Sequence, residues 1–444
     1  MRDMGRSDDP RVQAQLDRLS GLSIQRDTLG LDAIRTLLDR LGNPHKRLPP
    51  VFHVAGTNGK GSTCAFLRAM LEAQGYAVHV TTSPHLVRYN ERFRVAGKLI
   101  EDARLAELLE EVFDAADGLG CSFFEITIAA AFVEFARVPA DACVVEVGLG
   151  GRLDATNVLE PDVLAACGIA ALGIDHERFL LAPEEGVPTD PMARIAFEKA
   201  GIAKKGVPLV TMGQSYPPEA QREIEKIAAR IEAPLLPLGD AIDGESWHVD
   251  DMNGGPHGIY YRERVPDELF LPAPAISGSH QVMNAGLAVA MLRSQSTLKV
   301  DEEAMAKGMR DAFWPARMQL LAQGPLTALV ADQKVWLDGG HNPSAGEQIA
   351  AFLDGPLHLV LGMLNNKDPT AITAPLGDRV CSLSIVPVPG HAAHPANAFG
   401  PDAVARDDLE DALFNLPSDG HPILIAGSLY LAGEALKLND EIPD

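Results

Sequence analysis

Residues 51–63, VFHVAGTNGKGST, constrain the fold more than any other stretch of the chain. The first five residues form an apolar run that predicts a buried parallel strand. A glycine-rich turn follows, and Ser62 and Thr63 then open an apolar-periodic helix. This order of elements brings backbone N–H groups and the positive end of a helix dipole to one point, which favours a bound oxyanion. It therefore predicts an α/β sheet with a phosphate site beyond this strand.

The spacing within this loop differs from the common phosphate-binding pattern. In G-x-x-x-x-G-K-[ST], four residues separate the two glycines. Here two residues separate Gly56 from Gly59, and a further glycine, residue 61, stands between Lys60 and Ser62. The alternative is an ordinary glycine-rich turn between a strand and a helix. The coincidence of Gly, Lys and Ser/Thr at this place favours a triphosphate cradle, in which Lys60 adds a mobile positive charge.

Length and composition bound the class of protein. At 444 residues and 46% hydrophobic content, the chain can hold two domains with buried cores. Its formal net charge of −23 argues against general affinity for nucleic acid or acidic membranes, although a local cluster could bind a small anion. The five cysteines include no C-x-x-C pair, so buried free thiols are expected. Because residues 1–11 lack an apolar signal core and no apolar run reaches membrane-spanning length, we expect a cytoplasmic protein.

Two more predicted strands lead to residues that could serve the phosphate site. The strand at 77–82 runs into Ser83 and Pro84, and ligands of open α/β sheets lie at such carboxyl ends. Ser83 could therefore face the phosphates, or it could start the turn before Pro84. The strand at 163–169 leads to His176, which is either structural or part of the same edge. The residues alone leave both questions open.

Glu146 places a carboxylate within the strongly apolar strand predicted at 142–147. Burying such a charge is costly unless it is paired or bound to a cation. Glu146 could pair with Arg152 or Lys60, or it could hold a Mg²⁺ ion that also touches the phosphates. The phosphate loop upstream favours the metal.

The second half of the chain shows a change of pattern. Residues 239–275 are rich in Gly, Pro and Asp with brief alternation, which predicts a small antiparallel β addition. The polar segment 294–297, SQST, is the best linker candidate. The domains are therefore predicted as residues 1–297 and 298–444. Strands of the second α/β unit are expected at 336–338, 357–361, 384–388 and 422–426.

A series of motifs in one order resembles the Mur ligase superfamily, and specifically the folylpolyglutamate synthase/dihydrofolate synthase family. The resemblance runs through nearly the whole chain, and the short phosphate loop is the form this family carries. The motifs are HVAGTNGKGS at 53–62, SPHL at 83–86, NERFRV at 90–95, FFE at 123–125, EVGLGGRLDATN at 146–157, IDH at 174–176, EKAGI at 198–202, LDGGHNP at 337–343, LGMLNNKD at 361–368 and GSLYLAGE at 427–434.

The resemblance implies a fold and an activity. The fold is α/β: a P-loop-containing, Mur-ligase-like ATPase domain with a mostly parallel sheet and a small β addition, followed by a Rossmann-like α/β domain for glutamate ligation. The activity is an ATP-dependent amide ligase that adds L-glutamate to dihydropteroate and to reduced folates through an acyl phosphate. The resemblance also implies two Mg²⁺ ions and a monomer. ATP would lie on the first domain and the amino acid on the second, with closure excluding water.

The resemblance further assigns site residues. Lys60, Lys199 and His341 are similar to catalytic residues; Lys199 matches a lysine that the family carries as a carbamate, and His341 lies near the incoming amino acid. Metal ligands are implied for Ser83, Glu146 and His176. ATP contacts are implied for Thr57, Asn58, Gly59, Lys60, Gly61, Ser62, Asn284, Arg317 and Asp338. The pteridine-binding region resembles segments that contain Thr28, Leu29, Ser122, Phe124, Leu153 and Ala155.

The chain departs from the family pattern in three places. Residues 180–191 look like an extra loop between His176 and Lys199. Ala316 stands where the family has glycine, so it would carry strain if that backbone needs a positive φ. Two glycines, residues 339 and 340, replace a bulkier pair.

Three other functions could use parts of this sequence. A Mur-type ligase for a muramyl or other acidic acceptor would share the superfamily fold, but SPHL and NERFRV favour the folate branch. A P-loop kinase would use the same cradle and give a stable phosphorylated product. A non-enzymatic ATP-binding regulator would give no reason for a carboxylate, a histidine and a lysine to gather around the nucleotide.

Overall fold

The computed structural model describes residues 7–22, 30–252, 258–330 and 332–443. Thr28 and Leu29, predicted to contact the pteridine, lie outside these described residues. The chain divides into two compact units. The first contains residues 1–85, 90–275 and 281–313, and the second contains residues 86–89, 276–280 and 314–444.

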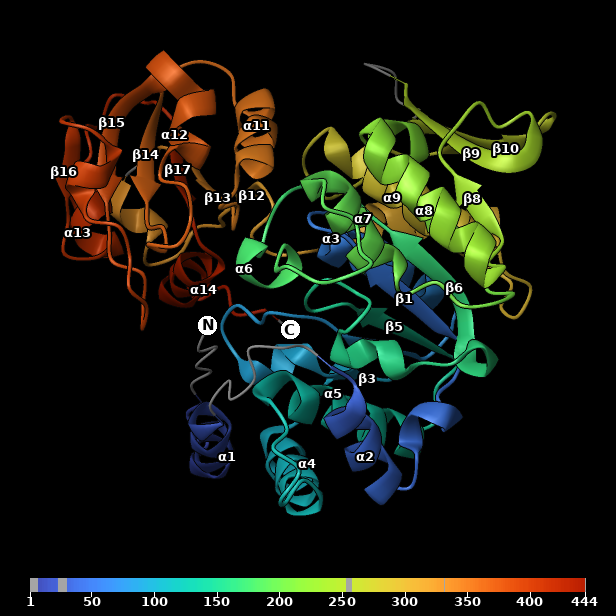
Figure 1. The fold of residues 1–444 in the computed structure, drawn as a ribbon. Coiled ribbons are helices and arrows are strands. Elements are labelled where there is room, and N and C mark those ends of the chain that lie inside the picture. Colours follow the sequence, from blue (N-terminus) through green and yellow to red (C-terminus); the bar gives the residue numbers. More distant parts are fainter. Residues whose placement is uncertain (1–6, 23–29, 253–257, 331, 444) are drawn as a thin grey trace. The chain divides into compact units, whose positions relative to one another are not determined.

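The first unit is built on an eight-stranded sheet (Figure 1). Six strands that reach one edge are parallel, and two short strands at the other edge are antiparallel. Strands β1 and β5 are buried along their whole length, as their apolar sequences predict for a sheet covered on both faces. In spatial order the strands are β4 (Lys98–Leu99), β3 (Arg94–Val95), β2 (Val78–Thr81), β5 (Ala142–Glu146), β1 (Val51–Ala55), β6 (Leu164–Ile169), β7 (Leu209–Thr211) and β8 (Leu235–Pro237).

The helices of the first unit follow the apolar periodicity of the sequence. Helix α5 is buried on nearly every side, in keeping with its run of small and apolar residues. The helices are α1 (Pro10–Gly21), α2 (Asp32–Arg40), α3 (Lys60–Ala73), α4 (Asp102–Ala115), α5 (Phe123–Arg137), α6 (Glu177–Leu180), α7 (Pro191–Ala200), α8 (Pro218–Ile231), α9 (His280–Arg293) and α10 (Glu302–Asp311).

The predicted β addition is present as a three-stranded antiparallel sheet (Figure 1). Its strands are β9 (Asp243–Asp251), β10 (Ile259–Arg264) and β11 (Asp267–Leu271). Alternate residues point inward, and Trp247 and Tyr261 are fully buried with their rings stacked 6.3 Å apart. The period-two alternation in the sequence therefore marks one buried face.

Helix α10 belongs to the first unit, beyond the linker predicted at residues 294–297. It packs against α3, and Gly308 lets the two backbones approach closely, because a Cβ at this position would lie 2.5 Å from the Met70 nitrogen. The compact units therefore divide after Phe313, later in the chain than the predicted boundary at 297/298. The boundary was predicted from the polar composition of residues 294–297, which is a local signal. The α3–α10 contact joins residues far apart in the chain and leaves no such local signal.

The second unit is an α/β sheet of six strands, parallel except for β12 at one edge. Neighbouring residues of each strand enter opposite cores: Leu424 packs with α11 and α12, whereas Ile423 and Ile425 pack with α13 and α14. The strands, in spatial order, are β12 (Gln319–Leu320), β13 (Val335–Leu337), β17 (Ile423–Ala426), β14 (Leu357–Leu361), β15 (Val380–Ile385) and β16 (Ala403–Ala405). The helices are α11 (Pro343–Phe352), α12 (Thr370–Leu376), α13 (Leu409–Phe414) and α14 (Leu429–Leu438).

The strand predicted at 384–388 is shifted in the structure, where β15 begins at Val380 and ends at Ile385. Its first half is half-buried or exposed and carries Cys381 and Ser382, so it lacks the apolar run on which the prediction relied. No helix in the described part of the chain is both long and apolar enough to cross a membrane.

Candidate active site

Four neighbouring parallel strands deliver the candidate residues to one edge of the first sheet. In the order β2-β5-β1-β6, these strands lead to Ser83, Glu146, the glycine-rich loop and His176. The register aligns their ends: Glu146 pairs with Val54 of β1, and Ala55 pairs with Ile169 of β6. Because the strands are parallel, all four candidates emerge on the same side, as expected for a ligand site in an open α/β sheet.

The glycine-rich loop ends in an open helix terminus. Gly59 adopts a φ of 83°, which glycine tolerates without strain, and α3 begins at Lys60. Among the described residues no side chain caps this helix, and the first bond of its ladder runs from the Thr63 nitrogen to the Gly59 oxygen at 2.9 Å. The N–H groups of residues 60–62 therefore stand at an uncapped, positive helix end, which is a suitable place for a phosphate.

The start of the loop is fixed by the segment after β6. The backbone nitrogens of Thr57 and Asn58 donate to the Ala171 oxygen at 2.8 and 3.2 Å. The Thr57 hydroxyl donates to the Gly173 oxygen at 2.8 Å and accepts from the Gly173 nitrogen at 3.0 Å. These two residues, predicted as ATP contacts, thus use their backbone N–H groups to shape the loop.

Two side chains complete the cradle. The Lys60 Nζ donates to the carbonyl oxygens of Gly56 and Thr57 at 3.1 and 3.2 Å, which keeps the ammonium group over the loop. Asn284 of α9 lies directly against Gly59, because a Cβ at Gly59 would clash with its amide. The structure therefore brings Asn284 to the loop from a position more than two hundred residues later in the sequence.

Glu146 is buried, with only 5% of its surface exposed, and its Oε2 accepts a hydrogen bond from the Ser83 nitrogen at 3.1 Å. An ion pair with Arg152 was one alternative to the favoured metal role, but the Arg152 guanidinium binds Glu184 and Glu198. No three His, Cys, Asp or Glu side chains cluster as a metal site among the described residues. A hard cation held by Glu146 would therefore need other oxygen donors, which the adjacent Ser83 hydroxyl, water and phosphates can supply.

His176 lies in a strained backbone conformation just after β6. Its φ is 53°, in the left-handed region that few residues with a side chain adopt. Its nitrogen donates to Asp175 Oδ1 at 2.7 Å, and its Nε2 lies 3.9 Å from Asp175 Oδ2. Such strain is typical of functional positions, where surrounding contacts hold the residue in place.

Lys199 is buried near the carboxyl end of α7, with 4% of its surface exposed. Burial and, after it, the charge of Lys60 lower the pKa of its ammonium group from 10.5 to about 7, against the opposing charges of Asp175, Asp154 and Glu198. A large share of Lys199 is therefore an uncharged amine near neutral pH, which is the form that can act as a nucleophile.

One predicted pteridine segment, at the start of α5, packs on the loop that leads to another. The Phe124 ring covers Gly148, where a Cβ would clash with it, so the start of α5 lies on the loop that continues to Leu153 and Ala155. Ser122 caps α5: its Oγ accepts from the Glu125 nitrogen at 3.3 Å, and the Glu125 side chain accepts from the Ser122 nitrogen at 2.7 Å. The Ser122 hydroxyl therefore has a structural role whatever it binds.

In the second unit, Asp338 organises the turn after β13. Its Oδ2 accepts from the Met318 nitrogen at 2.9 Å and its Oδ1 accepts from the Gly340 nitrogen at 2.6 Å. These bonds tie β13 to the segment that carries Arg317 and leave the aspartate buried.

Steric contacts explain why glycines stand at residues 339 and 340, where the chain departs from the family pattern. A Cβ at Gly339 would clash with Leu429 and lie 3.1 Å from Arg317 Nη1, and a Cβ at Gly340 would lie 2.8 Å from Asp338 Oδ1. His341 Nδ1 is 3.1 Å from the Gly339 oxygen. Arg317, Asp338 and His341 therefore lie together at one end of the six-stranded sheet of the second unit.

Sequence reasoning did not single out Asp154, which is fully buried beside the site. Its Oδ2 accepts from the Leu149 nitrogen at 2.8 Å, and its Oδ1 accepts from the Thr156 hydroxyl, which is 2.8 Å from His53 Nε2. Burial raises the pKa of the Asp154 carboxyl despite these bonds. An acid between Leu153 and Ala155, both of which were predicted in the pteridine region, was the signal that could have found it.

Known proteins resemble the chain over almost its full length, although no protein-family model matches it. The dihydrofolate synthase/folylpolyglutamate synthase of Bacillus subtilis is 33% identical to it, and the match covers 92% of this chain and 94% of that protein. The chain belongs to the folylpolyglutamate synthase/dihydrofolate synthase family. The Escherichia coli member is 30% identical over 96% of this chain.

Solved structures of this family have the same fold. Escherichia coli FolC in complex with DHPP and ADP gives a TM-score of 0.81 at 29% identity, covering 97% of both chains. A bifunctional folylpolyglutamate synthase/dihydrofolate synthase with Mn, AMPPNP and L-glutamate bound gives 0.80 at 29% identity, covering 96% of this chain and 97% of that one. The family, the Mur-ligase-like α/β fold and the ATP-dependent ligase class predicted from the motifs are thereby confirmed.

Proposed function

We propose that this chain ligates L-glutamate to dihydropteroate and to reduced folates at the expense of ATP, with ATP bound at the loop after β1. The observation that carries the proposal is the uncapped start of α3, with Lys60 held over the loop, on the same sheet edge as the buried Glu146 carboxylate. The Lys199 amine of α7 is close enough for the charge of Lys60 to help lower its pKa. Bound DHPP, AMPPNP and L-glutamate in the relatives' structures support the choice of substrates.

The reaction requires activation of a carboxylate, because a carboxylate and an ammonium group do not condense in neutral water. A carboxylate oxygen of the folate attacks the γ-phosphorus of ATP and ADP departs, which leaves an acyl phosphate. The glutamate amine then attacks the acyl carbon, phosphate departs and the amine loses a proton. Negative charge concentrates on the transferred phosphoryl group, so Lys60 and the N–H groups of residues 60–62 act by positioning and neutralising that charge.

Glu146, Ser83 and His176 would hold Mg²⁺, which when bound offsets phosphate charge; two such ions are proposed. Manganese in a relative's structure supports a divalent metal. The buried Glu146 carboxylate and the neighbouring Ser83 fit a hard cation, because both offer oxygen atoms at the sheet edge.

Lys199 is proposed to carry a carbamate. An uncharged amine is the form that adds CO₂, and its pKa of about 7 keeps this form populated near neutral pH. The carbamate replaces a positive group by an anionic oxygen donor beside Lys60, which suits a site that holds a cation. In the second unit, Arg317 and Asp338 are proposed to contact ATP, and His341 to lie near the glutamate.

A phosphate-release assay tests the function, with dihydropteroate and tetrahydrofolate compared side by side. We expect phosphate release to require glutamate with both acceptors. Release without glutamate, or a stable phosphorylated acceptor, would support a kinase or an ATPase instead.

Lys60→Ala tests the phosphate site within the same assay. Loss of this charge should remove about 3–4 kcal/mol of transition-state stabilisation and so lower turnover several-hundredfold while the protein stays folded. Lys205→Ala is the matched control, since this lysine is 70% exposed and pairs with Glu232 on the surface. Unchanged turnover in folded Lys60→Ala would exclude the phosphate role.

Lys199→Ala tests the carbamate. The variant should be inactive, because the anionic donor is lost, and added short-chain carboxylic acids should restore part of the activity by filling the space. Mass spectrometry of crystals or of rapidly trapped protein should detect the CO₂ adduct in the parent only. A fully active Lys199→Ala enzyme would remove the carbamate from the proposal.

A further inference from the structure

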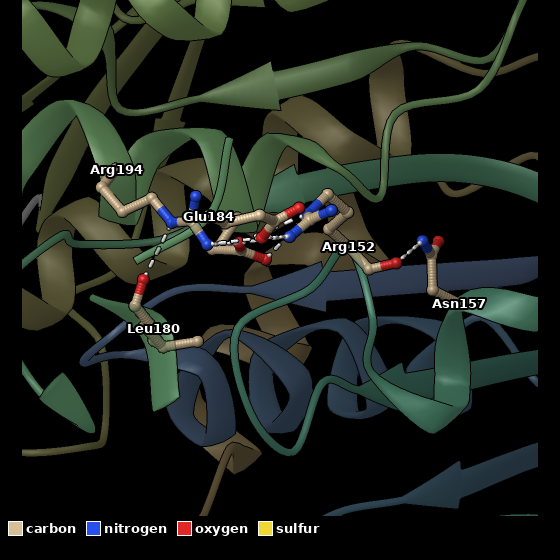
Figure 2. A network of polar contacts seen from close by, with 6 residues as sticks. Arg152, Asn157, Leu180, Glu184 and Arg194 are labelled. Carbon is tan, nitrogen blue, oxygen red and sulfur yellow. Dashed lines mark hydrogen bonds and ion pairs between the residues drawn. The ribbon is translucent and has the colours of Figure 1, made fainter. Parts of the chain in front are cut away.

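The extra loop between α6 and α7 is tied to α7 by ionic contacts (Figure 2). Glu184, within the loop, has its Oε2 2.6 Å from Arg152 Nη2 and 2.8 Å from Arg194 Nη2. At the start of the loop, the Leu180 oxygen accepts from Arg194 Nε at 2.9 Å. One loop carboxylate therefore joins α7 to the segment that follows β5.

The same two arginines share a second carboxylate. Glu198 Oε1 is 2.9 Å from Arg152 Nη2 and 3.0 Å from Arg194 Nη2. The cluster thus balances two cations with two anions. The side chains of Arg194 and Glu198 are only 5% and 4% exposed. Glu184 and Arg152 are more open to water, at 40% and 25% exposed, so the cost of losing Glu184 falls mainly on the buried Arg194, which would have to share one buried carboxylate with Arg152.

Arg152 also holds the turn of α7 that carries Lys199. Its backbone nitrogen donates to the Glu198 oxygen at 2.7 Å. Asn157 Nδ2 donates to the Arg152 oxygen at 2.9 Å (Figure 2) and to the Gly201 oxygen at 3.1 Å. A Cβ at Gly201 would clash with Arg152, so this contact is a close one. The position of Arg152 therefore fixes the backbone on both sides of Lys199.

We propose that Glu184 is a positioning residue for Lys199. It closes the ionic cluster, which holds Arg152 and Arg194 in place and through them the last turn of α7. The residue touches no reacting atom; it acts through the two arginines. The inference rests on the proposed role of Lys199, and it gives the extra loop a function that the sequence did not reveal.

Glu184→Gln in the full chain tests this inference, because it removes the charge while keeping the shape. We expect kcat to fall about ten- to hundredfold, since small displacements of a catalytic group have effects of this size. KM for ATP should change little, because the phosphate loop is untouched. Hydrogen exchange should become faster at amides of residues 195–201 as well as 181–190.

Two further variants make the result specific. Glu185→Gln removes the neighbouring, exposed loop charge and should match the parent protein in kcat and in exchange. Glu184→Asp keeps the charge and should recover part of the kcat, which a merely steric role of the side chain would not predict. Should Glu184→Gln fail to fold, the Asp variant carries the same comparison with an intermediate effect.

The inference would be overturned by an unchanged kcat in Glu184→Gln, whether or not the loop exchanges faster. Faster exchange confined to residues 181–190 would also overturn it, since Glu184 would then anchor the loop alone. Failure of the proposed function is distinguishable: if Lys199→Ala is fully active, the role of Lys199 falls, while exchange at 195–201 still reports whether Glu184 holds that turn.

Discussion

Ala316 adopts a left-handed backbone conformation, which its Cβ disfavours. Its φ is 53°, and Met318, two residues on, is also in the left-handed region at 40°. The Ala316 oxygen accepts from the Gly339 nitrogen and from Arg317 Nη1, each at 3.0 Å. These bonds and complete burial hold the strained residue in place beside Arg317. The strain expected from the family's glycine at this position is therefore present.

Ala316→Gly should leave stability within about 1 kcal/mol of the parent protein. Relief of a left-handed conformation gains about 1–2 kcal/mol, while the buried methyl and the added freedom of the unfolded chain oppose it by a similar amount. Ala435→Gly is the control, because this alanine is equally buried in the same core but lies within α14. It should cost about 1–2 kcal/mol. Equal losses in urea unfolding would contradict the assignment of strain.

Helix α5 shows how an element can be fixed by its own sequence at a position that also serves a site. Ser122 and Glu125 form a reciprocal cap, and this pattern of a serine followed three residues later by a glutamate is readable from the sequence. The cap sets where the helix begins, which places Phe124 of one predicted pteridine segment on Gly148, in the loop that leads to another. A local bond thus positions a long-range contact.

Ser122→Ala should lower the free energy of unfolding by about 1 kcal/mol, because the Glu125 nitrogen loses its acceptor. The effect should be the same with and without folate. Ser20→Ala, at an exposed hydroxyl near the end of α1, serves as the control and should have little effect. A rise in KM for dihydropteroate alone, with stability unchanged, would mean that the hydroxyl serves the ligand and not the helix.

At the scale of the whole molecule, the first unit buries a histidine in the middle of its sheet. Burial lowers the pKa of His53 from 6.5 to about 3. Its Nε2 meets the Thr156 hydroxyl, whereas its Nδ1 has no hydrogen-bond partner in the part of the chain that is described. A second proton on the ring would thus be a buried charge with no acceptor, which the fold disfavours.

Stability should therefore fall as the solution is acidified. The unfolded chain takes up a proton at His53 below about pH 6.5, while the folded protein does not until about pH 3. The stabilisation from neutral His53 is therefore fully present above pH 6.5 and is lost progressively as the pH falls from 6.5 to about 3. Near pH 5 the protonation of His53 in the unfolded chain lowers the free energy of unfolding by about 2 kcal/mol. Urea unfolding at several pH values should show a flatter dependence in His53→Gln than in the parent. Parallel curves would show that His53 does not titrate in this way.

The sequence by itself determined the features that depend on near neighbours. The strand and glycine-rich loop before α3 and the two-residue alternation of the β addition were predicted, because each follows from residues a few positions apart. The ligase class could be predicted because the motifs of the family stand in its order along the chain.

Only the tertiary structure decided which distant residues meet. In the structure Asn284 contacts Gly59, and the Ser83 nitrogen donates to Glu146. Arg152 pairs with Glu184 and Glu198. Helix α10 packs on α3. The lowered pKa of Lys199 belongs to the same class, because burial and the charge of Lys60 arise only when separate segments pack together. Such contacts depend on close approach in space, and spacing along a single sequence does not encode a distance between remote residues.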